Sequence, residues 1–264
     1  MNYKFIYLHS KLIMINKILN TFNLKLIKTN SIDNIENNIL KDNIEFSEFY
    51  NLCKLYTMTS MERLFSLYNS TNYIIKNNIP GDFVECGVWK GGSSMMIALV
   101  LNKNKIFDRK IYMYDTYEGM SEPDENDLDI SGQSAKSQLI NSSKENQKSV
   151  WCFSSLDEVK RNVTLTNFPM ELFQFVVGKV EDTIPDTIPI GEISLLRLDT
   201  DWYASTKQEL IHLYPKLVKK GVLIIDNYGH WQGCRKAVDE YFKSENINLL
   251  LNVIDYTGRS AIKI

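Results

Sequence analysis

The stretch that decides the fold is GDFVECGVWKGGSSMMIALVL, residues 81–101. It begins with a short apolar run at 83–86, passes through a turn rich in glycine, and continues into a segment of helical character. This order predicts a strand, a tight turn at Gly87, and a helix that Ser93 or Ser94 is suited to cap. In open α/β sheets such a turn lies at the carboxyl end of the first strand, where ligands bind. The stretch therefore predicts an α/β fold with a ligand site at this turn.

Strand and helix signals alternate on both sides of that stretch. Continuous apolar runs, typical of buried parallel strands, occur at 111–114, 173–177, 194–198 and 222–225. Two β-rich runs flank Thr257-Gly258 near the end of the chain and predict a terminal hairpin. The pattern predicts a mostly parallel sheet with helices on its faces and antiparallel pairing at one edge.

Two other segments have a distinct composition. Residues 1–45 are rich in Asn, Ile and Lys at roughly helical spacing, which predicts short amphipathic helices. We expect a helical extension at 1–55, serving as an acceptor lid or an oligomer contact, and a main domain at 56–264. The polar stretch at 118–149 is long for a loop in a compact domain, and such loops are usually functional lids or disordered segments.

The bulk composition excludes several classes of protein. The 264 residues are 44% hydrophobic and 23% charged with a net charge of -2, so no basic patch points to nucleic acid or a membrane surface. The four cysteines have no zinc or dithiol spacing, which favours a reducing compartment. Lys4, Lys11 and Lys17 interrupt the early apolar runs, and none approaches the roughly 20 residues of a membrane span. We expect a cytoplasmic protein.

Two carboxylates are expected beside the glycine turn. Asp115 ends the apolar run after the turn, about where a carboxylate accepts hydrogen bonds from ribose hydroxyls. Glu85, at the end of the first run, would suit an ammonium group and would disfavour a diphosphate. S-adenosylmethionine has a ribose and an ammonium but no phosphate, so the pair favours it over NAD. Alternatively, these carboxylates cap helices or pair with lysines.

A second acidic group follows two later strands. Asp199 and Asp201 come after the run at 194–198, while Asp226 and Asn227 follow the run at 222–225. Residues two apart in an extended chain point the same way, so both members of the first pair can face one site. Clustered buried acids are costly, and a divalent cation bound by oxygen ligands would remove that cost. Such a cation would also acidify an acceptor hydroxyl for a neighbouring base. Helix-capping aspartates on a solvated rim are the alternative.

The sequence resembles the macrocin O-methyltransferase (TylF-type) family from about Tyr56 to Lys263. The strings that carry the resemblance include TMTSMERL, YDTYEGMSEP, LLRLDTDWYASTKQELIHLYP and GVLIIDNYGHWQGCRKAVDEYF. The family comprises class I methyltransferases that include enzymes acting on deoxysugar hydroxyls of antibiotics. The resemblance implies a Rossmann-like fold with a mostly parallel seven-stranded sheet and S-adenosylmethionine as the cofactor.

The resemblance also implies roles for individual residues. Asp201 looks like the general base, and Asp199 and Asp226 look like ligands of Mg²⁺. The family usually has two aspartates where this chain has Asp226-Asn227, so the third ligand would be a neutral amide, with weaker affinity or a shifted metal preference. Cofactor contacts are implied for Thr57, Met58, Glu85, Gly87, Ser93 and Asp115.

The function expected from these features is O-methylation of a hydroxyl on a sugar or sugar-bearing small molecule, in bacterial surface polysaccharide or natural-product biosynthesis. One alternative is a non-sugar oxygen acceptor, such as a phosphoryl-type capsule decoration. Another, motivated by Asn227, is a cofactor-binding protein without turnover. A dehydrogenase is disfavoured because no GxGxxG pattern is present. The resemblance and the apolar N-terminal segments favour a homo-oligomer.

Overall fold

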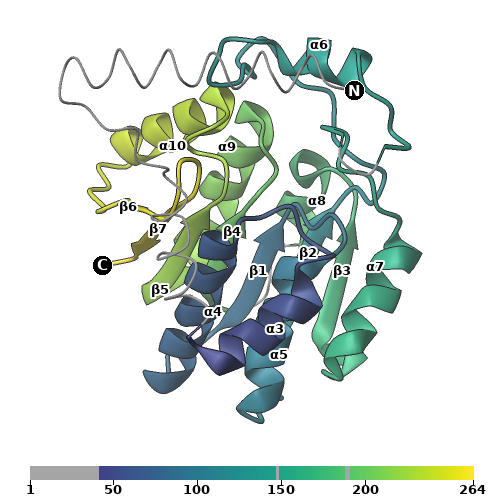
Figure 1. Cartoon of the computed structure of the whole chain (residues 1–264). Coiled ribbons are helices and arrows are strands. Elements are labelled where there is room, and N and C mark those ends of the chain that lie inside the picture. The colour runs from purple at the N-terminus through teal and green to yellow at the C-terminus, as the bar shows by residue number, and fades with distance from the viewer. Residues whose placement is uncertain (1–41, 147–148, 188–190) are drawn as a thin grey trace, which may run out of the picture. The chain divides into compact units, whose positions relative to one another are not determined.

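The structure is a computed structural model and describes residues 42–146, 149–187 and 191–264 (Figure 1). One compact unit spans Ile44–Ile264. It includes helix α3 (Ile44–Cys53), which falls within the predicted extension at 1–55. Residues 1–41, most of that extension, lie outside the described residues, so its role as a lid or oligomer contact stays a prediction.

The core of the unit is a seven-stranded sheet with the order β3-β2-β1-β4-β5-β7-β6. The first five strands are parallel, and β7 runs antiparallel to both β5 and β6. The predicted mostly parallel sheet with a C-terminal antiparallel hairpin is confirmed. The strands are β1 (Asp82–Cys86), β2 (Ile111–Asp115), β3 (Phe173–Val177), β4 (Ile193–Leu198), β5 (Leu217–Ile225), β6 (Asn252–Val253) and β7 (Arg259–Ile262).

Strand β5 begins five residues earlier than the apolar run at 222–225 indicated. The added part contains Lys219 and Lys220, whose side chains are exposed. The backbone N–H of Lys220 donates to Lys263 O at 2.7 Å, and Lys263 N–H donates to Gly221 O at 2.9 Å. Pairing with the end of the chain therefore extends the strand through polar residues that carry no apolar signal.

Helices cover both faces of the sheet. One group consists of α3, α4 (Met61–Lys76), α5 (Gly92–Lys103) and α7 (Leu156–Val163). In this group α3, α4 and α5 contact one another, and α7 contacts α5. Helices α3 and α4 lie in front of the strands in Figure 1. A second group consists of α8 (Val180–Thr187), α9 (Tyr203–His212) and α10 (Gln232–Ser244), with α9 between its neighbours. No helix in the described ranges is both long and apolar enough to cross a membrane.

The start of α5 differs from the sequence prediction. Its N-cap is Gly91, with a left-handed φ of 91° and no side-chain cap, so the prediction that Ser93 or Ser94 caps this helix was wrong. Both serines lie within the helix, and the Ser94 hydroxyl instead donates a hydrogen bond to Glu85. The Ser94 hydroxyl serves the buried Glu85 carboxylate instead of the helix end, because a buried acceptor without a hydrogen-bond partner is costly.

The described part of the polar stretch at 118–149 is packed onto the ends of two helices. It contains α6 (Ala135–Ile140) and an isolated bridge between Asp129 and Trp231. The buried Asp127 carboxylate accepts the backbone N–H of Tyr203, the first residue of α9, at 2.8 Å. The segment is thus built into the fold beside the carboxyl ends of the strands, and its action as a lid stays a prediction.

Candidate functional site

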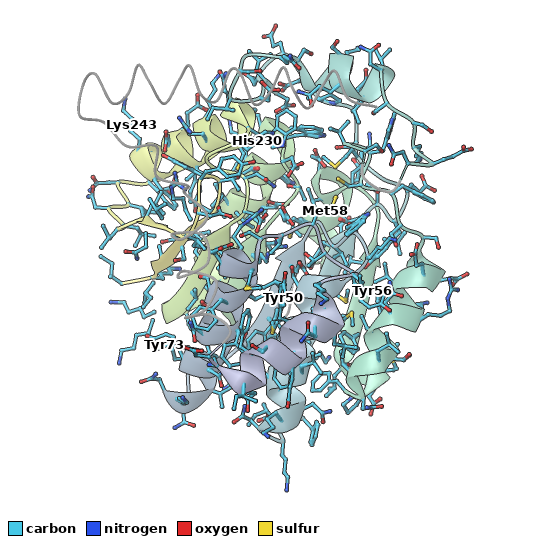
Figure 2. All side chains as sticks on the ribbon, viewed as in Figure 1. Tyr50, Tyr56, Met58, Tyr73, His230 and Lys243 are labelled. Atoms are coloured by element: carbon cyan, nitrogen blue, oxygen red, sulfur yellow. The ribbon has the colours of Figure 1, made fainter. Side chains whose placement is uncertain are left out.

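One cavity lies at the carboxyl ends of β1, β2, β4 and β5. Segments that are distant in sequence meet there: the loop between α3 and α4, the glycine turn, and the residues following the three other strands. Figure 2 shows Met58 of the first segment near the ends of the strands. Every residue predicted for the site lines this cavity: Thr57, Met58, Glu85, Gly87, Ser93, Asp115, Asp199, Asp201, Asp226 and Asn227.

The glycine turn brings three backbone segments into close contact. Gly87 has a φ of 82°, and a Cβ at this position would collide with the carbonyl oxygen of Asp199. Gly92 N–H donates to Tyr56 O at 2.8 Å, and a Cβ on Gly92 would lie 2.6 Å from that oxygen. Glycine is required at both positions because these backbones approach more closely than any side chain allows. The loop containing Thr57 is thereby held against the turn.

Asp115 organises the other side of the turn. Its carboxylate accepts backbone N–H groups from Val88 at 2.6 Å, Trp89 at 3.1 Å and Tyr117 at 2.7 Å. Burial raises the pKa of Asp115, while these N–H donors act in the opposite direction. The residue therefore shapes the turn in addition to lining the cavity. Its contact with a ribose stays a prediction.

Glu85 lies at the cavity floor with 1% of its surface exposed. One oxygen accepts a charged hydrogen bond from Arg197 at 2.6 Å, and the other accepts from the Ser94 hydroxyl. Burial raises the pKa of Glu85, and the neighbouring guanidinium lowers it. Since Arg197 already supplies the opposite charge, the predicted attraction of a cofactor ammonium is weaker than Glu85 alone would give, and this role stays a prediction.

Two arginines hold the acidic end of the sheet together. Arg197 of β4, only 2% exposed, contacts Glu85, Asp199 Oδ2 at 2.8 Å and Asp226 Oδ1 at 2.6 Å. Arg63 of α4 binds the other oxygen of Asp226. The sequence prediction missed both arginines. Arg197 could have been found from the sequence, since it is a lone cation inside the apolar run ISLLRL. A charge buried in a strand requires an acidic partner nearby.

Asp199 and Asp201 face the same cavity, as predicted, but for a different reason. Strand β4 ends at Leu198, and Asp201 has a left-handed φ of 73°, so a turn brings the carboxylates together rather than strand alternation. The Asn227 amide nitrogen donates to Asp199 Oδ1 at 2.7 Å and to Asp201 Oδ1. Burial, and then the charge of Asp226, raise the pKa of Asp201 to about 7. A carboxylate with that pKa is suited to general-base chemistry near neutral pH.

The predicted magnesium ligands do not fit a cation in this arrangement. Both oxygens of Asp226 accept from guanidinium groups, and Asn227 directs its nitrogen, not its carbonyl oxygen, at Asp199 and Asp201. Within the described ranges, no group of three or more His, Cys, Asp or Glu side chains is placed to hold a metal. The charges that were expected to require a metal are partly balanced by Arg63 and Arg197.

The sheet order, the antiparallel final hairpin and the cavity at the glycine turn define a class I methyltransferase of the Rossmann-like type. Residues 13–261 match the family described as Macrocin-O-methyltransferase (TylF), and the chain belongs to that family. It is therefore an S-adenosylmethionine-dependent O-methyltransferase.

Individual relatives agree with this assignment. Demethyldecarbamoylnovobiocin O-methyltransferase of Streptomyces niveus is 34% identical over 203 residues, which cover 77% of this chain and 74% of the relative. The 8-demethyl-8-(2,3-dimethoxy-alpha-L-rhamnosyl)-tetracenomycin-C 4'-O-methyltransferase of Streptomyces olivaceus is 31% identical, covering 77% of this chain and 74% of the relative. The solved structure of the O-methyltransferase NovP aligns with a TM-score of 0.69 and 31% identity, covering 79% of this chain and 82% of NovP.

Proposed function

We propose that this enzyme methylates a hydroxyl group of a sugar or sugar-bearing small molecule and that Asp201 is its general base. The observation that carries the proposal is the Asp201 carboxylate, which lines the same cavity as the glycine turn and has a pKa raised to about 7. A sugar acceptor is supported by the relative whose name specifies a rhamnosyl group.

In this proposal Asp201 takes the proton of the acceptor hydroxyl as that oxygen bonds to the transferred methyl carbon. S-adenosylmethionine supplies a methyl group on a positively charged sulfur, which leaves as a neutral thioether when its bond to the methyl breaks. The products are the methyl ether, S-adenosylhomocysteine and the protonated base. The remaining contribution of the protein is orientation, which can supply a large part of the rate enhancement.

Cofactor contacts are proposed for residues on three sides of the cavity. Gly87 and Ser93 bring the turn and the start of α5 to the cavity, and Asp115 offers its carboxylate to a ribose. Thr57 and Met58 approach from the opposite loop, where Met58 is 47% exposed and free to pack against a ligand. Glu85 completes the proposed set from the floor.

Several finer predictions accompany this proposal. A role in bacterial surface polysaccharide or natural-product biosynthesis, a cytoplasmic location and a homo-oligomeric state stay predictions. The proposed reaction has no step on magnesium, because the geometry around Asp226 and Asn227 does not fit a cation. A non-sugar oxygen acceptor, such as a phosphoryl-type group, is the second candidate, and binding without turnover is the third.

The test begins with isothermal titration of S-adenosylhomocysteine into the purified full chain, followed by mass spectrometry of candidate acceptors incubated with S-adenosylmethionine. We expect binding, and gain of one methyl group on a sugar hydroxyl. Asp201→Asn is the matched control, since it should bind S-adenosylhomocysteine but form little product. Absence of binding would contradict the cofactor assignment, and methylation only of non-sugar acceptors would contradict the acceptor class.

A further inference from the structure

Asn227 makes an unusual pair of contacts at the end of β5. Its single amide nitrogen donates to one oxygen of Asp199 and to one oxygen of Asp201, which belong to the neighbouring strand end. A primary amide has two hydrogens, so both are used to link the two carboxylates. The amide therefore occupies the position between them at which a positive charge would otherwise be needed.

We propose that Asn227 frees this active site from a divalent cation by placing an N–H₂ donor between Asp199 and Asp201. This inference rests on the proposed methyltransferase function and deepens it. A reversed amide would bring its carbonyl oxygen against two carboxylate oxygens, which is repulsive, so the observed orientation is the stable one without a metal.

The residue type at position 227 decides the outcome. An aspartate has no hydrogen to donate when ionised, and it would add a negative charge beside Asp199 and Asp201. Three carboxylates facing one point repel one another unless a cation binds them. The same backbone would thus hold a metal with aspartate at this position and an internal hydrogen-bond bridge with asparagine.

The surrounding ion pairs support the same conclusion. Arg197 binds Asp226 and the second oxygen of Asp199, and the side chains of Arg197 and Asp226 are each 3% exposed. Arg63 binds the remaining oxygen of Asp226. A cation entering between Asp199 and Asp226 would have to displace buried guanidinium groups from carboxylates, and such pairs are costly to break. A cation would therefore have to bind between residue 227, Asp201 and the first oxygen of Asp199, where the Asn227 amide now lies. The two arginines thereby supply charge that a metal would otherwise provide.

The test is a titration of Mn²⁺ into the full chain saturated with S-adenosylhomocysteine, with free Mn²⁺ measured by electron paramagnetic resonance. Asn227→Asp is the test variant. Asn252→Asp, at an exposed position in β6, adds the same charge away from the site. We expect the wild type and Asn252→Asp to bind Mn²⁺ weakly, and Asn227→Asp to bind it about 10-fold to 100-fold more tightly.

Two results would overturn the inference: wild-type affinity equal to that of Asn227→Asp, or wild-type turnover that EDTA abolishes and Mg²⁺ restores. If the variant does not fold, the wild type still decides, because tight Mn²⁺ binding by the wild type, or turnover that EDTA abolishes, is itself contrary evidence. Failure of the proposed function is seen separately, as absence of S-adenosylhomocysteine binding before any metal is added.

Discussion

Replacing Glu209 by glutamine should change how the stability of this enzyme depends on pH. The Glu209 side chain of α9 is 0% exposed, and its Oε1 accepts a hydrogen bond from the Thr200 hydroxyl at 2.8 Å. Burial raises the pKa of this carboxyl well above its ordinary value of 4.5, more than the hydrogen bond from Thr200 lowers it. Thr200 lies between Asp199 and Asp201, so this buried carboxyl supports the turn that aims the proposed base.

The sign of the effect follows from proton binding. Between the ordinary pKa of 4.5 and the raised pKa of the folded state, Glu209 is protonated when folded and ionised when unfolded. Folding then takes up one proton, so the free energy of unfolding contributed by this group falls as pH rises. The slope is about 1.4 kcal/mol per pH unit for one proton. Glutamine does not titrate, and its amide oxygen can still accept from Thr200.

The assay is urea unfolding of wild type and Glu209→Gln, followed by tryptophan fluorescence at about pH 5.5 and about pH 6.5. Over that unit the wild type should lose more stability than the variant, up to about 1.4 kcal/mol. Glu171→Gln, which removes an exposed carboxyl, is the surface control. Equal pH slopes for wild type and Glu209→Gln would falsify the assignment of a neutral Glu209 in the folded enzyme.

Three further predictions concern the cavity. Asp201→Asn should leave S-adenosylhomocysteine affinity nearly unchanged and lower turnover by about a hundredfold or more. Wild-type turnover should rise through about pH 7 as Asp201 ionises. Unchanged turnover in Asp201→Asn would show that Asp201 is not the base. Arg197→Met should cost about 3–5 kcal/mol in urea unfolding, because Glu85 and Asp226 lose a buried partner, and a loss below about 1 kcal/mol would contradict the ion-pair argument. Gly87→Ala should weaken cofactor binding in calorimetry and destabilise the fold by more than about 1 kcal/mol, since its positive φ and lack of space both oppose a side chain.

Much of the site was predictable because its chemistry is tied to the ends of strands. The apolar runs located β1 to β5, and the carboxyl ends of parallel strands meet at one edge of a sheet. Glu85 and Asp115 were therefore placed at the same edge as Asp199 and Asp226 without knowledge of any contact, and the cavity contains all of them. The first residues of β5 were missed because their backbone pairing with the end of the chain needs no apolar side chains.

The sequence by itself determined the order of strands and helices, the glycine turn and the edge at which the polar residues gather. Only the tertiary structure decided which of those residues are neutralised by one another. Arg63 and Asp226 are 163 residues apart, and Arg197 and Glu85 are 112 apart, so no local pattern specifies their pairing. Buried charges select partners by distance and desolvation in the folded chain. For that physical reason the sequence suggested a metal at Asp226 and Asn227. In the folded chain, guanidinium groups bind Asp226 instead, and the Asn227 amide donates hydrogen bonds to the neighbouring carboxylates.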